Sequence, residues 1–259
     1  MHKIDNIKNT KTKSSISASK LIPNLITIIG LTIGLSSIRF ALEEKWEYSV
    51  VCILIAAFFD GLDGRIARFL NATSKFGAEL DSLSDLVNFG VCPAILIYLW
   101  SLYECKVRVL SWLVVVFFVI CMAIRLARFN TIVCDGESSD FHKKFFVGIP
   151  APAAAILALM PIILEMEVAL KFNVPIKSNF LGIIIYFVVV GILTTSTIPT
   201  FGIKSIKLKP KYIWFFLVSF SLVAVTLMVY PWRFLPFLCM LYLCSIPVST
   251  YIVYRRDFP

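Results

Sequence analysis

The sequence is poor in the residues that build zinc sites and disulfide frameworks. Its 259 residues include only two histidines, His2 and His142, and its seven cysteines are scattered without a Cys-x-x-Cys pair. Zinc sites use closely spaced cysteines and histidines, and small secreted frameworks use many cysteines at regular spacings. The sequence therefore argues against a zinc site and against a disulfide framework.

Charged residues are also scarce, and long apolar runs take their place. Charged residues make up 16% of the chain and hydrophobic ones 59%, and the mean hydropathy is +0.85. This hydrophobic share is well above that of soluble domains. A helix needs roughly 20 apolar residues to cross the hydrocarbon layer of a membrane. Uncharged runs of about that length cover 21–38, 86–103, 109–124, 145–164, 178–203, 212–232 and 234–254.

An eighth apolar run, 48–59, is shorter and needs the residues after Asp60 to complete a crossing. The runs together predict an all-α, polytopic transmembrane bundle of about eight helices. No internal repeat or domain boundary divides them, so residues 21–254 are predicted to form a single transmembrane catalytic domain.

The first 20 residues are polar and rich in lysine, serine and asparagine, which is typical of a disordered segment. They resemble the start of a signal peptide, but the run after them lacks a small-residue cleavage site and further helices follow. We expect residues 1–20 to be a basic cytoplasmic tail and residues 255–259 to be the cytoplasmic C-terminus.

The basic residues predict the orientation in the membrane. If the N-terminus is cytoplasmic, 18 of the 25 lysines and arginines fall on that side and 7 on the other. This bias follows the positive-inside rule and places both termini and the inner loops in the cytoplasm, in the cell (inner) membrane. The net charge of +9 then reflects topology and attraction to anionic membrane lipids, and no soluble basic domain exists to bind nucleic acid.

Two acidic stripes lie between residues 60 and 88. Relative to Asp60, the residues Asp63, Gly64, Ala67 and Arg68 fall at +3, +4, +7 and +8, which places them on one helix face.

The second stripe contains Gly77, Asp81, Asp85 and Asn88, at 0, +4, +8 and +11. The short link 69–76 between the stripes makes the two helices antiparallel neighbours, so the four aspartates are expected to face one another near the cytoplasmic edge of the membrane.

Four carboxylates at a membrane edge are costly without a cation, because like charges repel and burial adds a desolvation cost. Arg65 and Arg68 cannot neutralise all four. Oxygen ligands without histidine or cysteine favour a hard ion, so we predict one or two Mg²⁺ or Mn²⁺ ions. Two alternatives are charges that snorkel to the interface and an ion or proton pathway, as in a divalent-cation transporter.

The motif from Asp60 to Asp85, Asp-x2-Asp-Gly-x2-Ala-Arg-x8-Gly-x3-Asp-x3-Asp, resembles the signature of the CDP-alcohol phosphatidyltransferase family at every fixed position. The similarity to the phosphatidylserine synthase branch extends to Asn24 and Thr27 in the first apolar run and to the segments 76–90, 125–130 and 148–152. Ser82 and Leu86 stand where the glycerophosphate branch usually has proline and lysine. Asn88 departs from the serine branch, where serine is commoner.

This resemblance implies a six-helix family core within the bundle, a homodimer, and a definite reaction. The phosphatidyl group of CDP-diacylglycerol would pass to the hydroxyl of L-serine, giving phosphatidylserine and CMP. Sister enzymes that use glycerol 3-phosphate or inositol as acceptor are the main alternative.

The resemblance also implies a role for each residue of the motif. Asp60, Asp63 and Asp81 would be metal ligands, and Asp85 would complete the site of a second ion and act as a general base on the acceptor hydroxyl. The cytidine diphosphate pocket would be lined by Gly64, Ala67, Arg68, Gly77, Asn24 and Thr27.

Arg125, Arg128 and Asn130 are the candidates for binding the serine carboxylate, because a planar guanidinium group matches a carboxylate. The alternative is that the two arginines only anchor the end of their helix. The segment Gly148-Ile-Pro-Ala-Pro152 is expected to shape the start of a helix.

Overall fold

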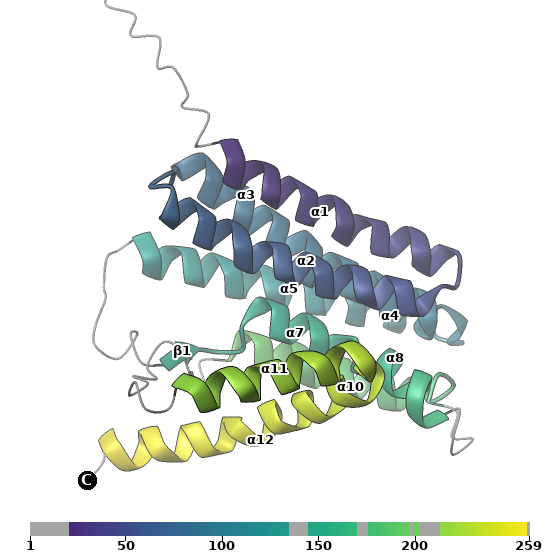
Figure 1. The fold of residues 1–259 in the computed structure, drawn as a ribbon. Coiled ribbons are helices and arrows are strands. Elements are labelled where there is room, and N and C mark those ends of the chain that lie inside the picture. Colours follow the sequence, from purple (N-terminus) through teal and green to yellow (C-terminus); the bar gives the residue numbers. More distant parts are fainter. Residues whose placement is uncertain (1–20, 135–144, 170–175, 197–198, 202–212, 258–259) are drawn as a thin grey trace, which may run out of the picture.

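The computed structural model describes residues 21–134, 145–169, 176–196, 199–201 and 213–257. These residues form a helical bundle with one small two-stranded sheet (Figure 1). Three predicted segments lie wholly or partly outside the described residues: the basic tail 1–20, the polar connection at 135–144, and the C-terminus at 258–259. The assignment of domains stays a prediction.

The first two helices form an antiparallel hairpin, α1 (Leu21–Leu42) and α2 (Trp46–Phe69). Small residues on α1 let the helices approach closely: a β-carbon on Gly30 would lie 3.2 Å from the β-carbon of Phe59. Close approach through small residues is a common way of packing membrane helices. The hairpin brings the first turns of α1 beside the last turns of α2, where both acidic residues of the first stripe lie.

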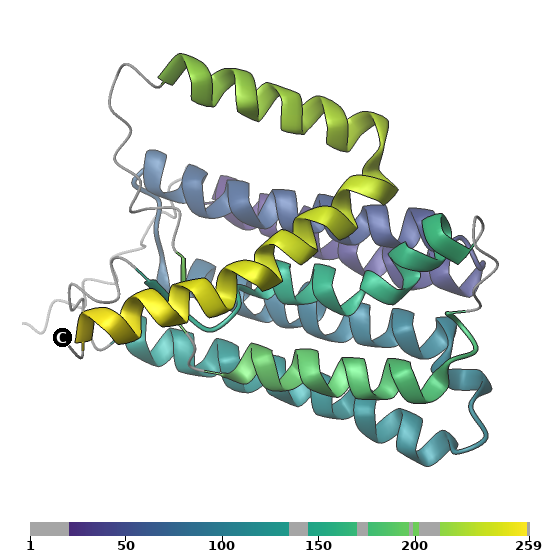
Figure 2. The ribbon, with the colours of Figure 1, turned by 90° about the horizontal axis from the view of Figure 1, so that it is seen from below.

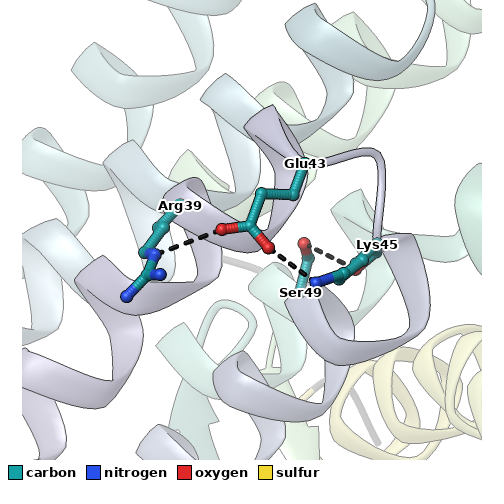
Figure 3. Close-up of polar contacts among 4 residues, drawn as sticks. All are labelled: Arg39, Glu43, Lys45 and Ser49. Carbon is teal, nitrogen blue, oxygen red and sulfur yellow. Dashed lines mark hydrogen bonds and ion pairs between the residues drawn. The ribbon is translucent and has the colours of Figure 1, made fainter.

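The connection between α1 and α2 is held by a small polar network at the opposite end of the hairpin (Figure 3). Glu43 accepts a hydrogen bond of 2.7 Å from Lys45 Nζ and one of 3.2 Å from Arg39 Nε. Ser49 Oγ donates to the carbonyl of Lys45 at 3.1 Å. The hydrogen bond and charge of Lys45, followed by those of Arg39, lower the pKa of Glu43.

The third span is continuous but changes its helical pitch. It consists of α3 (Lys75–Asp85), the π-helical turn η2 (Leu86–Val91) and α4 (Cys92–Trp100). Ser74 caps α3 by accepting the backbone N–H of Gly77 at 3.0 Å. The sequence predicted a span that begins at residue 86, whereas the helix begins at 75, so the second acidic stripe belongs to the span itself.

The short 3₁₀ turn η3 (Leu102–Glu104) leads to α5 (Arg108–Cys134). After it come the strand β1 (Phe145–Val147), α7 (Ala151–Ala158), α8 (Met160–Leu164) and the π-helical turn η4 (Glu165–Ala169). The expected helix start is confirmed, since Pro150 is the N-cap of α7 and Pro152 lies in its first turn.

The strand β1 pairs antiparallel with β2 (Pro199–Phe201), so the fold is not purely helical. The sequence had placed both segments inside apolar helical runs, 145–164 and 178–203. Proline disfavours helical geometry in the residue before it, and Gly148 has φ +80°, which ends any helix at this point. Both features therefore keep the segment before α7 extended.

The remaining helices are α10 (Phe180–Thr195), α11 (Ile213–Val229) and α12 (Pro231–Asp257). α10 packs on α5, where the rings of Phe118 and Phe187 lie 4.6 Å apart. α12 contacts β2 and α8 and crosses the bundle obliquely, while α11 stands at its rim (Figure 2).

Buried apolar side chains gather on α4, α5, α7 and α8, and large apolar side chains are exposed on α1, α5 and α11. Met228 on α11, for example, is 89% exposed. Exposed apolar surface of this extent is typical of a lipid-facing surface. Within the described part of the chain, three helical stretches are long and apolar enough to cross a membrane, Leu21–Leu42, Lys75–Trp100 and Arg108–Thr131, and Phe180–Thr195 is a shorter apolar helix. The predicted helical membrane architecture is confirmed at this level, and the number of eight spans stays a prediction.

Candidate active site

Three of the four aspartates of the motif come together at one end of the bundle. Asp60 and Asp63 lie on the last turns of α2, and Asp81 lies on the second turn of α3. One carboxylate oxygen from each lies within 4.8 Å of the others. The two stripes therefore face each other as their spacing predicts, and Asp63 is almost fully buried, with 3% exposed.

Asp85 joins this group from one turn further along α3. Its carboxyl group lies beside that of Asp60 and interacts with it electrostatically. Like charges this close repel each other, and a divalent cation between them would relieve the repulsion.

The surroundings of the four aspartates fit a cation. Among the residues that the structure describes, no lysine or arginine forms an ion pair with any of the four. The hydroxyl of Thr27 on α1 lies 2.6 Å from Asp63 Oδ2 and donates to it. The donor set is therefore carboxylate oxygen, which hard divalent ions prefer.

Thr27 has a second role that the sequence did not suggest. It was predicted to line the nucleotide pocket, and it does line the cavity described next, but its hydroxyl also fixes the carboxylate of Asp63. The same hydroxyl lies 3.1 Å from the carbonyl of Pro23. α1 thus positions a predicted metal ligand as well as bordering the pocket.

A cavity of about 280 Å³ adjoins the acidic cluster. Its lining combines the start of α1, the end of α2, the link between α2 and α3, and the start of α3. The six residues predicted for the nucleotide pocket all line it, together with two of the aspartates: Pro23, Asn24, Thr27, Asp63, Gly64, Ala67, Arg68, Ala72, Thr73, Ser74, Gly77, Ala78 and Asp81.

The two glycines of this cavity have different surroundings. A β-carbon on Gly64 would meet no atom within 4 Å, so this position opens directly onto free space. A β-carbon on Gly77 would lie 2.9 Å from Asn24 Oδ1 and 3.1 Å from Ser74 Oγ. Gly77 is therefore needed for packing, whereas Gly64 leaves room for a ligand.

Five of the lining residues were not predicted as site residues: Pro23, Ala72, Thr73, Ser74 and Ala78. The stretch 69–76 had been treated only as a link between two helices. A serine just before a helix is an N-cap signal, and it could have placed Ser74 at the start of α3, beside the pocket. Arg68, which was predicted, donates from Nε to the carbonyl of Gly64 at 3.0 Å.

The three candidates for binding serine have protein partners of their own. Arg125 Nε donates to the carbonyl of Ile149 at 2.6 Å, and Arg128 Nη2 donates to the carbonyl of Ser196 at 3.2 Å. Both arginines therefore bind chain segments that flank the small sheet.

Asn130 also has a partner, because its amide nitrogen donates to Ser82 Oγ at 3.0 Å. This bond ties α5 to α3, directly beside Asp81.

Arg125 differs from the other two candidates because one of its donor nitrogens, Nη1, is buried without a partner among the described residues. The guanidinium group also interacts electrostatically with Asp60 and Asp85. A buried cationic donor beside the acidic cluster is suited to hold an anionic group.

Comparison with known proteins identifies the family of this site. The family model of CDP-alcohol phosphatidyltransferases matches residues 20–244, which is most of the chain. The chain belongs to the CDP-alcohol phosphatidyltransferase family. Members are metal-dependent membrane enzymes, and the cluster of Asp60, Asp63 and Asp81 in this transferase has the geometry to hold a metal ion.

Named relatives narrow the comparison. The chain is similar to the CDP-diacylglycerol–serine O-phosphatidyltransferase of Mycobacterium leprae, with 34% identity over 230 residues that cover 89% of this chain and 74% of the relative. It is 38% identical to the protein of the same name from Helicobacter pylori over 208 residues, or 79% of this chain and 82% of the relative. The archaetidylserine synthase of Methanothermobacter thermautotrophicus is 34% identical over 137 residues, 52% of this chain and 54% of the relative.

Proposed function

We propose that this transferase moves the phosphatidyl group of CDP-diacylglycerol to the hydroxyl of L-serine, giving phosphatidylserine and CMP. Relatives named for this reaction align with most of the chain. The structural observation that carries the proposal is the cluster of four aspartates at the edge of the 280 Å³ cavity. A diphosphate needs a cation site such as the aspartates could form, and the attached nucleoside needs an adjoining cavity.

The aspartates and the cavity divide the binding of CDP-diacylglycerol between them. Asp60, Asp63, Asp81 and Asp85 hold Mg²⁺ or Mn²⁺, with two ions as the expected number. When bound, these ions would neutralise the diphosphate charge and that of the departing CMP. The open space at Gly64 admits the nucleotide close to the α2 backbone, and Arg68 at the cavity wall adds positive charge toward the phosphates.

The transfer itself exchanges one bond to phosphorus for another. The serine hydroxyl oxygen forms a bond to the phosphorus that carries the diacylglycerol, and the bond from that phosphorus to the oxygen of CMP breaks. CMP leaves with that oxygen and its electron pair. Asp85 takes the proton of the serine hydroxyl, and the spare donor of Arg125 holds the serine carboxylate.

The site is proposed to face the cytoplasm, where serine is soluble. The start of α1, the link between α2 and α3, and the C-terminal end of α12 lie at the same end of the bundle (Figure 1). The basic residues of the sequence favour that end as the cytoplasmic one. A homodimer in the inner membrane is proposed on the family resemblance.

Acceptor-dependent release of CMP tests the proposal. The purified chain, reconstituted in liposomes with CDP-diacylglycerol and Mn²⁺ or Mg²⁺, is supplied with serine, glycerol 3-phosphate or inositol. We expect CMP to be released when serine is the acceptor and not when glycerol 3-phosphate or inositol is. Turnover with another acceptor and none with serine would contradict the acceptor assignment, and cation flux without CMP release would indicate a transporter.

A further inference from the structure

A side-chain hydrogen bond joins α3 to α5 beside the acidic cluster, through Ser82 and Asn130. Asn130 Nδ2 donates to Ser82 Oγ at 3.0 Å, and Asn130 Oδ1 lies 3.2 Å from the same oxygen. Both ends of the amide reach one hydroxyl, so the pair persists whichever way the amide is turned. Ser82 Oγ also lies 3.0 Å from the carbonyl of Ala78, which accepts its proton when Nδ2 is the donor.

The pair lies between the groups that are proposed to hold the two ends of serine. Ser82 follows Asp81 directly and precedes Asp85 by three residues, so it shares a side of α3 with Asp85. Asn130 follows Arg125 by five residues, which is about 7.5 Å along a helix axis. The pair therefore joins the helix of the proposed base to the helix of the proposed carboxylate ligand.

The end of α5 is held on two sides. On the side of the small sheet, Arg125 and Arg128 donate to the carbonyls of Ile149 and Ser196. On the side of the third span, α5 packs against η2 and α4 and less against α3. Where two helices pack less closely, a side-chain bond between them has more influence on their spacing. Ser82 and Asn130 supply that bond at the level of the acidic cluster.

We propose that Ser82 and Asn130 form a positioning clamp for the acceptor: their hydrogen bond holds α5 at the distance from α3 at which one serine molecule reaches both Arg125 and Asp85. This inference rests on the proposed function and deepens it, because the clamp selects an acceptor by the length between its carboxylate and its hydroxyl. Asn130 then acts through the helix spacing and not as a ligand of serine.

The test is Ser82→Ala in the full chain, reconstituted in liposomes with CDP-diacylglycerol and Mn²⁺. Loss of one neutral hydrogen bond should raise the KM for serine by about fivefold and change the KM for CDP-diacylglycerol by less than about twofold. Homoserine is longer than serine by one methylene group. The preference for serine over homoserine should therefore also fall by about fivefold, because the unclamped helices can separate.

Two further serine variants provide the rescue and the matched control. Ser82→Thr keeps the hydroxyl and should retain the wild-type KM and preference. Ser84→Ala removes a serine–asparagine bond of the same chemistry on the same span, since Asn88 Nδ2 donates to Ser84 Oγ at 3.2 Å. That bond joins neighbouring turns and not two helices, so Ser84→Ala should leave the KM for serine and the preference over homoserine unchanged.

A double-variant cycle separates a clamp from direct binding by Asn130. If both residues act through one bond, Asn130→Ala should match Ser82→Ala, and the double variant should be no worse than either single one. Additive losses in the double variant would show that Asn130 or Ser82 contacts serine independently, and would overturn the clamp.

The remaining outcomes distinguish this inference from the proposed function. If the wild-type chain releases no CMP with serine, the proposed function fails and the clamp fails with it. If the wild-type chain is active but Ser82→Ala leaves the preference for serine over homoserine unchanged, the clamp alone is overturned. The same holds if Ser84→Ala or Ser82→Thr reduces that preference as much as Ser82→Ala does.

Discussion

The site has an acidic part, the four aspartates of α2 and α3, and a basic part, Arg125 and Arg128 of α5. The two parts differ in which groups of the protein satisfy their charges. The aspartates of α2 and α3 face one another, and the bond from Thr27 to Asp63 is a neutral hydroxyl contact that brings no opposite charge. The arginines of α5 instead donate to backbone carbonyls at Ile149 and Ser196. The acidic part is therefore suited to a cation from outside the chain, whereas the basic part already contributes to the fold.

This difference predicts different results of mutation. Removing an acidic charge should relieve repulsion and abolish chemistry without harming the fold. Removing an arginine should cost both stability and substrate affinity. The predictions that follow test this contrast, beginning with the largest expected effect.

Replacing Asp81 by asparagine should abolish turnover. Asp81 is part of the three-carboxylate cluster, and loss of a metal ligand removes several kcal/mol of charge stabilisation, or about a thousandfold or more in kcat. The temperature of unfolding should stay the same or rise, because a like charge disappears.

The matched control is Glu79→Gln, an exposed acidic residue on the same helix. CMP release by the purified variants measures the effect. Equal activity of the two variants would contradict the role of Asp81 as a metal ligand.

Replacing Arg125 by alanine should raise the KM for serine by about 10- to 100-fold, because a buried charged donor to the carboxylate is lost. Arg128→Ala removes a comparable anchor, the bond to Ser196, and is expected to have a smaller effect on serine. Both variants should lower the temperature of unfolding. Initial rates against each substrate check the prediction, and an equal rise in KM for serine and for CDP-diacylglycerol would contradict a carboxylate site.

Replacing Gly64 by alanine should raise the KM for CDP-diacylglycerol by about 10-fold through steric exclusion, since about 1 kcal/mol or more of binding is lost. The added methyl group would enter the cavity, where no protein atom lies within 4 Å.

Gly61→Ala is the control, because Gly61 lies on the same helix, has equally open surroundings and does not line the cavity. Both variants gain helix propensity, so their stability should be equal or higher. If Gly61→Ala impairs binding as much as Gly64→Ala, the cavity is not the nucleotide pocket.

Replacing Gly34 by alanine should lower the free energy of unfolding by about 1–3 kcal/mol, because it overpacks the contact between α1 and η2 next to the aspartates. A β-carbon at this position would overlap the amide oxygen of Asn88, which lies on the π-helical turn one turn beyond Asp85.

The double variant Gly34→Ala/Asn88→Ser should recover most of the loss, because serine is smaller. Thermal unfolding in detergent measures both. A double variant as unstable as the single one would show that this contact does not set the spacing of α1 and η2.

The sequence predicted that the aspartates lie together but not which groups the arginines bind, and the physical reason is separation along the chain. Asp60 to Asp85 lie on two helices joined by a short link, so helical periodicity alone brings their stripes together. Gly64, Ala67, Arg68 and Gly77 lie on the same two faces, whereas Asn24 and Thr27 were assigned to the pocket only by the resemblance.

The partners of the arginines could not be predicted in this way. Arg125 and Ile149 are 24 positions apart, and Arg128 and Ser196 are 68 positions apart, so only tertiary packing joins them. The strands β1 and β2 were hidden in apolar runs, where hydrophobicity favours a helix and only proline and Gly148 oppose it. The π-helical turn after Asp85 has no signal in the spacing of apolar residues.

Binding of Mn²⁺ to the purified chain tests the central claim most directly, because it needs no acceptor and no lipid. Electron paramagnetic resonance of free Mn²⁺ reports binding as the ion is titrated, with and without CDP. We expect saturable binding to the wild-type chain, tighter binding when CDP is present, and loss of both in Asp81→Asn but not in Glu79→Gln. Binding of Mn²⁺ by Asp81→Asn as tightly as by the wild-type chain would contradict the account.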